Sequence, residues 1–260
     1  MNISVLVVLY NQSLDDIACL DAALAAPQVS QVVVCDNSTI ANDNEARAAE
    51  CGVTYVSMGG NKGLPVAYNA GVDRCRGDVV CVFDDDTTVG ADYFEAVEAL
   101  WASDGAWDIA LPLVMAGEDV LSPSTFDGLR SRPFSDAGEI ADARDISGIN
   151  SGMAVRREAY SKVRYCEDLF LDLVDHRFLQ DAKERGLRIV YLEGPVLCQS
   201  YSLESDDADA ALARLRIFSR DARAFYSGSL ARVVYCRAML LARRAKLAVR
   251  YRSPRFLWSS

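Results

Sequence analysis

The sequence predicts an α/β protein built on a mostly parallel, doubly wound sheet, and two observations lead to this prediction. The first 86 residues alternate four times between apolar, β-branched runs and helical patterns. That alternation is typical of parallel strands joined by right-handed crossovers. Polar clusters also follow these runs, and the carboxyl ends of strands are where ligands bind in open α/β sheets. We therefore expect one binding edge.

The elements are expected from apolar periodicity and from turn residues. Strands are expected over 3–9, 31–35, 53–56, 78–83, 107–115 and 187–192, with a short extended piece over 196–201. Helices are expected over 14–25, 41–51, 64–74, 91–101, 156–163, 171–185, 206–226 and 229–252. Pro112 should interrupt its strand. The weakly periodic segment 116–143 predicts an irregular loop, either a lid or binding loop or a partly disordered insertion.

Length and composition leave room for one large domain or two small ones. The chain has 260 residues, of which 51 % are hydrophobic, and contains no uninterrupted apolar run of about 18 residues that would predict a spanning helix. Its first residues lack a basic region and a cleavage site, so they predict a strand rather than a signal peptide. The eight cysteines form no C-x-x-C pair, which favours reduced, buried thiols in a cytoplasmic protein.

Charge is distributed unevenly along the chain. Residues 211–260 hold 12 Lys or Arg and one acidic residue, whereas residues 1–210 hold 15 Lys or Arg and 36 Asp or Glu. The last expected helix alternates apolar and basic residues, which is typical of a helix lying on an anionic membrane surface, with Phe256, Leu257 and Trp258 as interfacial anchors. The alternative is a helix packed on the protein body. The acidic body argues against a nucleic-acid partner.

Three consecutive carboxylates, Asp84, Asp85 and Asp86, end the apolar run VVCVF. Like charges this close raise one another's pKa unless a cation or hydrogen bonds offset them. Carboxylate oxygens suit Mg²⁺ or Mn²⁺, which proteins commonly share with substrate phosphates. The alternative is a solvated acidic turn that caps the next helix.

Six segments together resemble the family 2 glycosyltransferases of the GT-A fold. They are VVLYN (7–11), VCDNS (34–38), GGNKGLPVAYNAG (59–71), FDDDT (83–87), NSGMAVRREAY (150–160) and FLDLVDHRF (170–178). Each is weak singly, but they follow the family's order and span about two thirds of the chain. The segments at 59–71 and 170–178 look most like bacterial rhamnosyltransferases and galactofuranosyltransferases.

The resemblance implies a role for each matching position. It implies that Asp36 binds the base or ribose of a nucleotide sugar, that Asp84 and Asp86 form a DxD element with Asp86 as the direct metal ligand, and that Asp175 is the catalytic base. The backbone would approach donor or acceptor at Gly152. The remaining nucleotide-site positions are Tyr10, Asn11, Asn61, Lys62, Gly63, Asn69 and Asp85.

Two features near the expected base leave alternatives open. Asp172 lies three residues before Asp175, so both could face the cleft from one helix, and Asp172 is the second candidate for the base. Either could instead only supply charge to a helix N-terminus. Many relatives carry a metal-binding histidine near 198–200, where this chain has Cys198 and Gln199. The only histidine, His176, could tune Asp175, touch the acceptor or lie on a helix surface.

The implied protein is an inverting, metal-dependent glycosyltransferase using Mn²⁺ or Mg²⁺. Its donor would be a nucleotide-diphospho-sugar, with dTDP-L-rhamnose favoured over a UDP-sugar, and its acceptor a cell-surface or lipid-linked glycan. Residues 1–205 would form the catalytic domain, as a nucleotide-binding half (1–90) and an acceptor half (91–205). Residues 206–260 would form a basic helical region at the inner membrane face. A homo-oligomer is compatible with the sequence.

Two other functions fit part of the sequence. FDDDTT satisfies the D-x-D-x-T element of haloacid-dehalogenase phosphatases, but three βα units precede it here and that element normally lies on the first strand. A nucleotide-sugar-binding subunit without turnover would explain the missing histidine.

Overall fold

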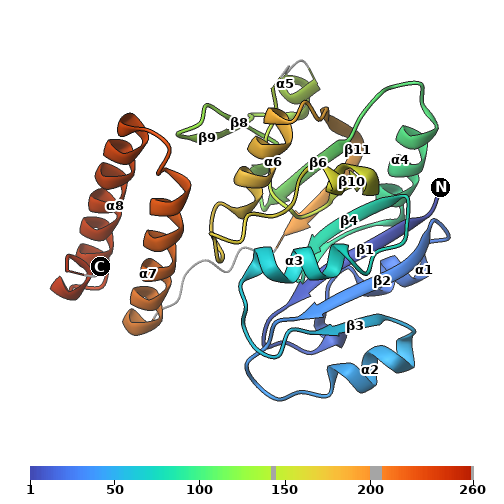
Figure 1. Ribbon diagram of the computed structural model, residues 1–260, viewed down its shortest axis with the longest axis horizontal. Coiled ribbons are helices and arrows are strands. Elements are labelled where there is room, and N and C mark those ends of the chain that lie inside the picture. Colours follow the sequence, from blue (N-terminus) through green and yellow to red (C-terminus); the bar gives the residue numbers. More distant parts are fainter. Residues whose placement is uncertain (142–144, 200–206, 259–260) are drawn as a thin grey trace.

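The computed structural model describes residues 1–141, 145–199 and 207–258 (Figure 1). Within these residues a nine-stranded sheet has the order β3-β2-β1-β4-β10-β6-β11-β5, with β7 paired to β6. Its strands are β1 (Ile3–Leu9), β2 (Val29–Asp36), β3 (Thr54–Ser57), β4 (Val79–Asp84), β5 (Thr87–Thr88), β6 (Ile109–Ala116), β7 (Asp119–Ser122), β10 (Met153–Arg156) and β11 (Ile189–Gln199). A separate pair is formed by β8 (Ser124–Phe126) and β9 (Ser131–Pro133).

The pairing confirms a mostly parallel sheet. Strands β1, β2, β3 and β4 are parallel neighbours, and β6 and β11 form a second parallel pair. The antiparallel strand β10 lies between β4 and β6 and joins the two groups. The carboxyl ends of β1, β2 and β4 therefore share one edge, as the sequence predicts.

Both faces of the sheet are covered by helices, which explains why β1 is apolar throughout. Leu6 and Val8 face a core that contains residues of α3 (Leu64–Val72) and α6 (Val174–Glu184), whereas Val5 and Val7 face α1 (Leu20–Ala25) and α4 (Ala91–Ala102). All seven residues of β1 are buried. Helix α2 (Asn44–Cys51) packs beside β3 at the sheet's end (Figure 1).

Three predicted elements differ from those observed. The helix expected over 14–25 is a 3-10 turn (Leu14–Asp16) followed by α1, because the Ala18 backbone N–H donates to the Asp85 carbonyl instead of continuing a helix. Pro112 does not interrupt β6, since it lies beside a register shift in β11 between Leu192 and Val196. That shift also lets β11 run as one strand where two pieces were expected, although residues 200–201 lie outside the described residues.

The prediction of an irregular loop over 116–143 is wrong for the residues that the structure describes, which reach 141. They contain β7, β8, β9 and α5 (Ala137–Ala141). The β8–β9 hairpin turns at Asp127, whose Oδ1 accepts the backbone N–H groups of Leu129 and Arg130. Such aspartate turns have little apolar periodicity, so composition alone predicted a loop.

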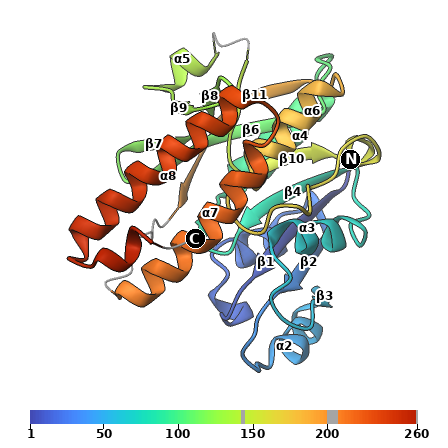
Figure 2. The same ribbon diagram turned by 60° about the vertical axis from the view of Figure 1, so that its left-hand side comes forward.

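Helices α7 (Ala208–Phe225) and α8 (Leu230–Arg250) lie side by side at one flank of the molecule (Figures 1 and 2). Phe225, Cys236 and Leu240 belong to the same buried cluster as Leu6 and Val8 of β1. The two helices therefore share a hydrophobic core with the sheet. In the described part of the chain, no helix is long and apolar enough to cross a membrane. All eight cysteine thiols are free, and most are buried.

Gly77, in the turn before β4, should be sensitive to substitution. A Cβ there would lie 2.5 Å from the Ser4 nitrogen and 2.8 Å from the Asn2 carbonyl oxygen, both of which are backbone atoms at the start of β1. Gly77→Ala is therefore expected to lower the free energy of unfolding by about 1–3 kcal/mol, measured by urea denaturation. Gly105→Ala, where the nearest atom is a serine hydroxyl at 3.4 Å, is the control. Equal stability of the two variants would contradict this packing.

Candidate active site

The acidic triplet lies in a tight turn where β4 returns as β5. In β5, Thr87 pairs with Gln199 at the end of β11, so the side chain of Gln199 lies beside the turn. Its amide nitrogen donates to Asp84 Oδ2 at 3.2 Å and to Asp86 Oδ1 at 3.1 Å. One donor thus bridges two carboxylates that would otherwise repel each other.

Asp84 is held by further side chains from behind the sheet edge. The Tyr68 hydroxyl of α3 donates to Asp84 Oδ1 at 3.0 Å, and the Ser151 hydroxyl donates to Oδ2. Thr87 donates in turn to Ser151 at 3.0 Å. Tyr68, Thr87 and Ser151 are fully buried, so this carboxylate has a fixed orientation.

The other two carboxylates keep their protons more tightly than a free aspartate. Burial, then the charges of Asp84 and Asp86, raises the pKa of Asp85 to about 6. Burial also raises the pKa of Asp86, and the hydrogen bond from Gln199 opposes this shift only in part. Such a site would be relieved by a positive charge.

The triplet opens into a cleft of about 700 Å³. The predicted residues that line it are Tyr10, Asn61, Gly63, Asp84, Asp85 and Asp86. Sequence reasoning missed Asn37, Phe170, Gln199 and a wall formed by α7, which contributes Ala210, Ala213, Arg214 and Ile217. Only the segments containing Asn37 and Phe170 had been recognised; the helical periodicity of α7 does not indicate which face meets a cleft.

Gly63 belongs to this cleft for a steric reason. Its φ is +88°, and a Cβ would lie 2.7 Å from the Phe170 ring. The next residue, Leu64, donates its backbone N–H to the Phe170 carbonyl at 2.7 Å. The glycine loop and the segment that precedes α6 therefore meet edge to edge.

Asp36, expected to bind base or ribose, does not line this cleft. It is 4 % exposed, and its carboxylate accepts hydrogen bonds from the Ser38 backbone, Asn42, Asn44 and the Tyr55 hydroxyl. Burial alone would raise its pKa, but the hydrogen bonds outweigh burial and hold the pKa below its usual range. In this structure Asp36 orders the loop after β2, while its neighbour Asn37 faces the cleft.

Four other predicted positions also act through the scaffold. Asn11, with φ +54°, accepts the backbone N–H groups of residues 39 and 40, and Lys62 donates its backbone N–H to the Asn37 side chain. The amide of Asn69 ties α3 to residues 165 and 167. Gly152 is enclosed by Leu197 and Pro112 side chains. None of the four is among the residues that line the 700 Å³ cleft.

Asp175 lies in the first turn of α6 and within electrostatic reach of the triplet. Burial raises the pKa of this carboxyl, the positive charge of His176 opposes the shift, and the charge of Asp84 adds to it. The charge of Asp175 in turn contributes to the raised pKa of Tyr68, whose hydroxyl bonds Asp84. The structure thus brings the two acidic centres together.

The prediction that Asp172 and Asp175 share a helix face is wrong. Leu173 between them has φ +61° and precedes α6, so Asp172 is outside the helix. Its carboxylate is 16 % exposed and forms a two-pronged ion pair with Arg214 of α7, including a contact of 2.6 Å from Nη2 to Oδ1. Asp172 therefore joins α7 to the cleft.

A buried carboxylate of α7 anchors the same segment. Asp221 is fully buried and accepts the backbone N–H groups of residues 170, 171 and 172 at 3.1, 2.8 and 2.9 Å. The sequence marks it only as the single acid in a basic tail. Three consecutive N–H groups directed at one carboxylate fix the chain just before α6.

His176 does not lie free on a helix surface. Its ring stacks on Phe126 of β8, with centroids 4.9 Å apart, and Nδ1 lies 3.1 Å from the Ser147 hydroxyl. The β8–β9 hairpin is thereby attached to the helix that carries Asp175.

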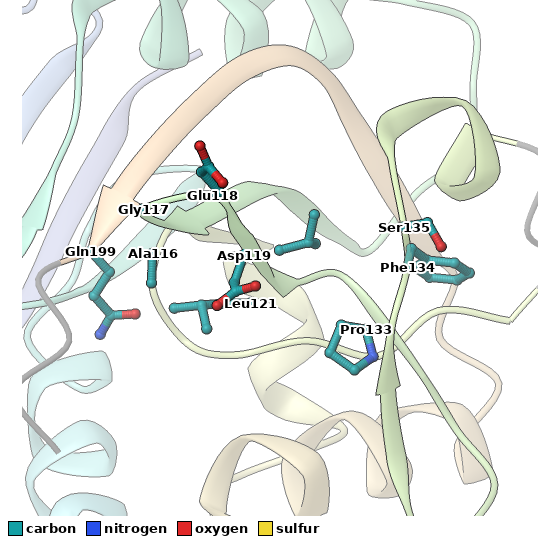
Figure 3. Close-up of a pocket in the computed structure, with 10 residues that line it drawn as sticks. Ala116, Gly117, Glu118, Asp119, Leu121, Pro133, Phe134, Ser135 and Gln199 are labelled. Atoms are coloured by element: carbon teal, nitrogen blue, oxygen red, sulfur yellow. The ribbon is translucent and has the colours of Figure 1, made fainter. Parts of the chain in front are cut away.

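A second cleft, of about 870 Å³, begins at Gln199 on the side away from α7 (Figure 3). Its walls are the β6–β7 turn, with Glu118 and Asp119, and the end of β9, with Pro133, Phe134 and Ser135. Figure 3 shows Gln199 at one end and Phe134 with Ser135 at the other. Gln199 is common to both clefts.

Comparison with known sequences identifies the family. Residues 4–164 match the family profile of glycosyl transferase family 2. The chain belongs to glycosyl transferase family 2. No curated protein sequence matched. The match removes the phosphatase alternative, because FDDDTT lies on the fourth strand of this family's domain rather than on a first strand.

Solved structures share the fold at low identity. A mannosyltransferase from Pyrobaculum calidifontis, in complex with GDP-Man and Mn²⁺, is 16 % identical with a TM-score of 0.59, covering 96 % of this chain and 82 % of its own. GalNAc-T7 with UDP, GalNAc and Mn²⁺ is 15 % identical, with a TM-score of 0.64 over 99 % of this chain and 55 % of its own. TarS 1-349 of S. aureus is 15 % identical, with a TM-score of 0.55 over 86 % of this chain. This chain spans 66 % of that TarS structure, just under two thirds. The fold is GT-A.

Asp85→Asn should stabilise the metal-free protein at neutral pH. The folded state holds this proton up to a pKa of about 6, whereas a free aspartate has a pKa of 3.8. Raising the pH across that window therefore favours the unfolded chain, which releases the proton earlier. Removing the charge should increase stability at pH 7 by about 1–2 kcal/mol, after allowance for solvent screening.

Urea denaturation in EDTA at several pH values measures this effect. The wild type should lose stability as pH rises through the window, and Asp85→Asn should lose less. Asp104→Asn, an exposed aspartate after α4, is the control. Parallel pH profiles for all three proteins would show that Asp85 is not strained.

Proposed function

We propose that this protein is an inverting, divalent-metal-dependent glycosyltransferase that moves a sugar from a nucleotide diphosphate to an acceptor hydroxyl. The observation that supports it most is the pair Asp84 and Asp86, bridged by one amide donor at the mouth of a cleft and electrostatically linked to Asp175. Family membership and the nucleotide complexes of the structural neighbours support the same reaction class.

The carboxylates fit Mn²⁺ or Mg²⁺. Gln199 already places an electropositive N–H group between Asp84 and Asp86, which is the position a cation would share. Among the described residues no three His, Cys, Asp or Glu side chains form a metal site. Asp86 and Asp84 would therefore hold the ion jointly with phosphate oxygens of the donor. When bound, it would neutralise charge on the departing diphosphate.

The chain's own residues would position the donor and accept the proton. Asn37 and Asn61 line the nucleotide end of the cleft, and Arg214 lies on its opposite wall. Asp175 would take the proton of the attacking hydroxyl, since burial gives it a raised pKa and hence a greater basicity than a free aspartate. Asp172 is the weaker candidate because Arg214 occupies its oxygens.

The acceptor would enter through the 870 Å³ cleft that meets the donor cleft at Gln199. Glu118 and Asp119 on its rim disfavour anionic acceptors, so a neutral glycan hydroxyl fits this entrance. We favour dTDP-L-rhamnose as donor because segments 59–71 and 170–178 resemble rhamnosyltransferases; a UDP-sugar is the other candidate. The enzyme would act at the cytoplasmic membrane face on a cell-surface or lipid-linked glycan.

Asp86→Ala should remove the metal dependence of donor binding. Wild-type affinity for a nucleotide sugar, measured by calorimetry across a donor panel, should rise with Mn²⁺, whereas the variant should bind equally weakly with and without it. The expected loss is at least about tenfold, because one of two carboxylate ligands is removed. Asp92→Asn, on the exposed start of α4, serves as the control. A variant that kept the Mn²⁺ response would exclude Asp86 as a ligand.

Asp175→Asn should abolish turnover without abolishing donor binding. We expect kcat to fall by about 10²–10⁴-fold, with the donor Kd unchanged. Wild-type activity should rise with pH through a pKa above that of a free aspartate, because the base must be ionised. Asp168→Asn, on the exposed loop before α6, is the control.

The alternative of a binding subunit without turnover makes a different prediction. In that case neither wild type nor Asp175→Asn would transfer the sugar or hydrolyse the donor, although both would bind it.

A further inference from the structure

A third cleft, of about 510 Å³, lies between α7 and α8 and is not used by the proposed reaction. Its walls combine apolar side chains with arginines. The lining residues are Arg223, Tyr226 and Ser227 from the end of α7 and the following turn, and Val233, Cys236, Arg237, Leu240, Leu241 and Arg244 from α8. An apolar cavity with a cationic rim suits a ligand that is itself amphiphilic.

The arginines of this cleft lack anionic partners in the described part of the chain. Arg223, Arg237 and Arg244 form none of the ion pairs found there. Arg244 is the most constrained, because its Nε and Nη2 atoms are buried without a hydrogen-bond partner. Buried donors left unpaired cost free energy, and an anion in the cleft would satisfy them. The nearby acid Asp221 is already bonded to the backbone of residues 170–172.

Helix α8 also presents apolar side chains to solvent next to this cleft. Leu230, Val234, Leu241 and Val249 are 79, 57, 65 and 79 % exposed. The first three recur at helical spacing on one side, and Leu241 belongs both to this stripe and to the cleft wall. Trp258, shortly after the helix, is 84 % exposed. The stripe and the cleft therefore form one continuous surface.

We propose that the α7–α8 cleft binds the phosphate of an anionic membrane lipid, with the lipid chains against the exposed apolar stripe of α8. Arg223, Arg237 and Arg244 would contact the headgroup, and Leu241 would lie at the boundary between headgroup and chain. A free phosphate leaves the apolar stripe exposed, and an apolar peptide leaves the buried Arg244 donors unsatisfied. A lipid phosphate satisfies both, and arginine is well suited to phosphate recognition.

This site would fix how the protein meets the membrane. One end of α7 lines the donor cleft through Ala213 and Arg214, while its other end lines the lipid cleft through Arg223 and Tyr226. Asp221, between them, fixes the segment before α6. A lipid held at α8 would thus set the catalytic cleft at a constant position above the bilayer. That consequence for a lipid-linked acceptor rests on the proposed function, whereas lipid binding itself does not.

Vesicle flotation of the full chain tests the proposal. The triple variant Arg223→Gln, Arg237→Gln, Arg244→Gln should bind phosphatidylcholine vesicles containing phosphatidylglycerol about 100-fold more weakly than wild type, since each arginine contributes a substantial increment at an anionic surface. The matched control Arg216→Gln, Lys246→Gln, Arg252→Gln removes the same charge from exposed positions outside the cleft. It should stay within about threefold of wild type. Equal loss in both triples would show diffuse attraction only and overturn the proposal.

Two further measurements keep the result decisive. Leu241→Ser should weaken vesicle binding with all arginines present, whereas Ile40→Ser, equally exposed on the catalytic half, should not. A short-chain, water-soluble phosphatidic acid should bind wild type in calorimetry at least about tenfold more tightly than inorganic phosphate; equal affinity would mark a free-anion site instead. A wild-type dimer that the triple variant dissociates, without vesicle binding, would assign the surface to a second copy.

The outcome is separable from that of the proposed reaction. The arginine triple should keep wild-type donor binding and transfer to a soluble acceptor, because none of its residues lines the donor cleft. Loss of vesicle binding with intact transfer supports the lipid site. A protein that binds vesicles through these arginines but transfers no sugar would refute the proposed function alone.

Discussion

The structure depends on the crowding of three carboxylates at the end of β4. Repulsion among Asp84, Asp85 and Asp86 is tolerated because Tyr68, Ser151 and Gln199 direct hydrogen bonds at them from three different elements. Each donor reaches the turn only because its own backbone is fixed by the sheet or by a helix on it. The raised pKa of Asp85 shows that the compensation is incomplete, which leaves the site electrostatically suited to a cation and a diphosphate.

Helix α7 connects the acidic centre to the rest of the molecule. Asp221 and Arg214 engage residues 170–172 from one helix, the first through backbone N–H groups and the second through Asp172. These contacts fix the segment that leads into α6 and Asp175, and they also form a wall of the donor cleft. The C-terminal helices are therefore structural parts of the catalytic cleft, and removing them would expose the core around Phe225 and Leu240.

Some site residues were recognisable from sequence and others were not, for a physical reason. Asp84, Asp86 and Gly63 follow strands or lie in glycine loops, so their position at the binding edge follows from the alternation of elements. Asp36 and Asn69 carry the same chemical signal, but their side chains are used by the scaffold. Side-chain orientation within a polar cluster depends on which donors surround it, and these come from distant segments. Gln199 could not be assigned because its place follows from the antiparallel pairing of β11 with a two-residue strand.

The sequence alone determined the α/β class, the parallel first half of the sheet, the acidic edge and the family resemblance, because these depend on local periodicity and on short motifs. Only the tertiary structure decided that Asp172 pairs with Arg214, that Asp221 anchors residues 170–172, and that arginines and leucines of two helices enclose a common cleft. Those features join residues about 40 or more positions apart or depend on how two helices pack, and neither is encoded in the period of a single segment.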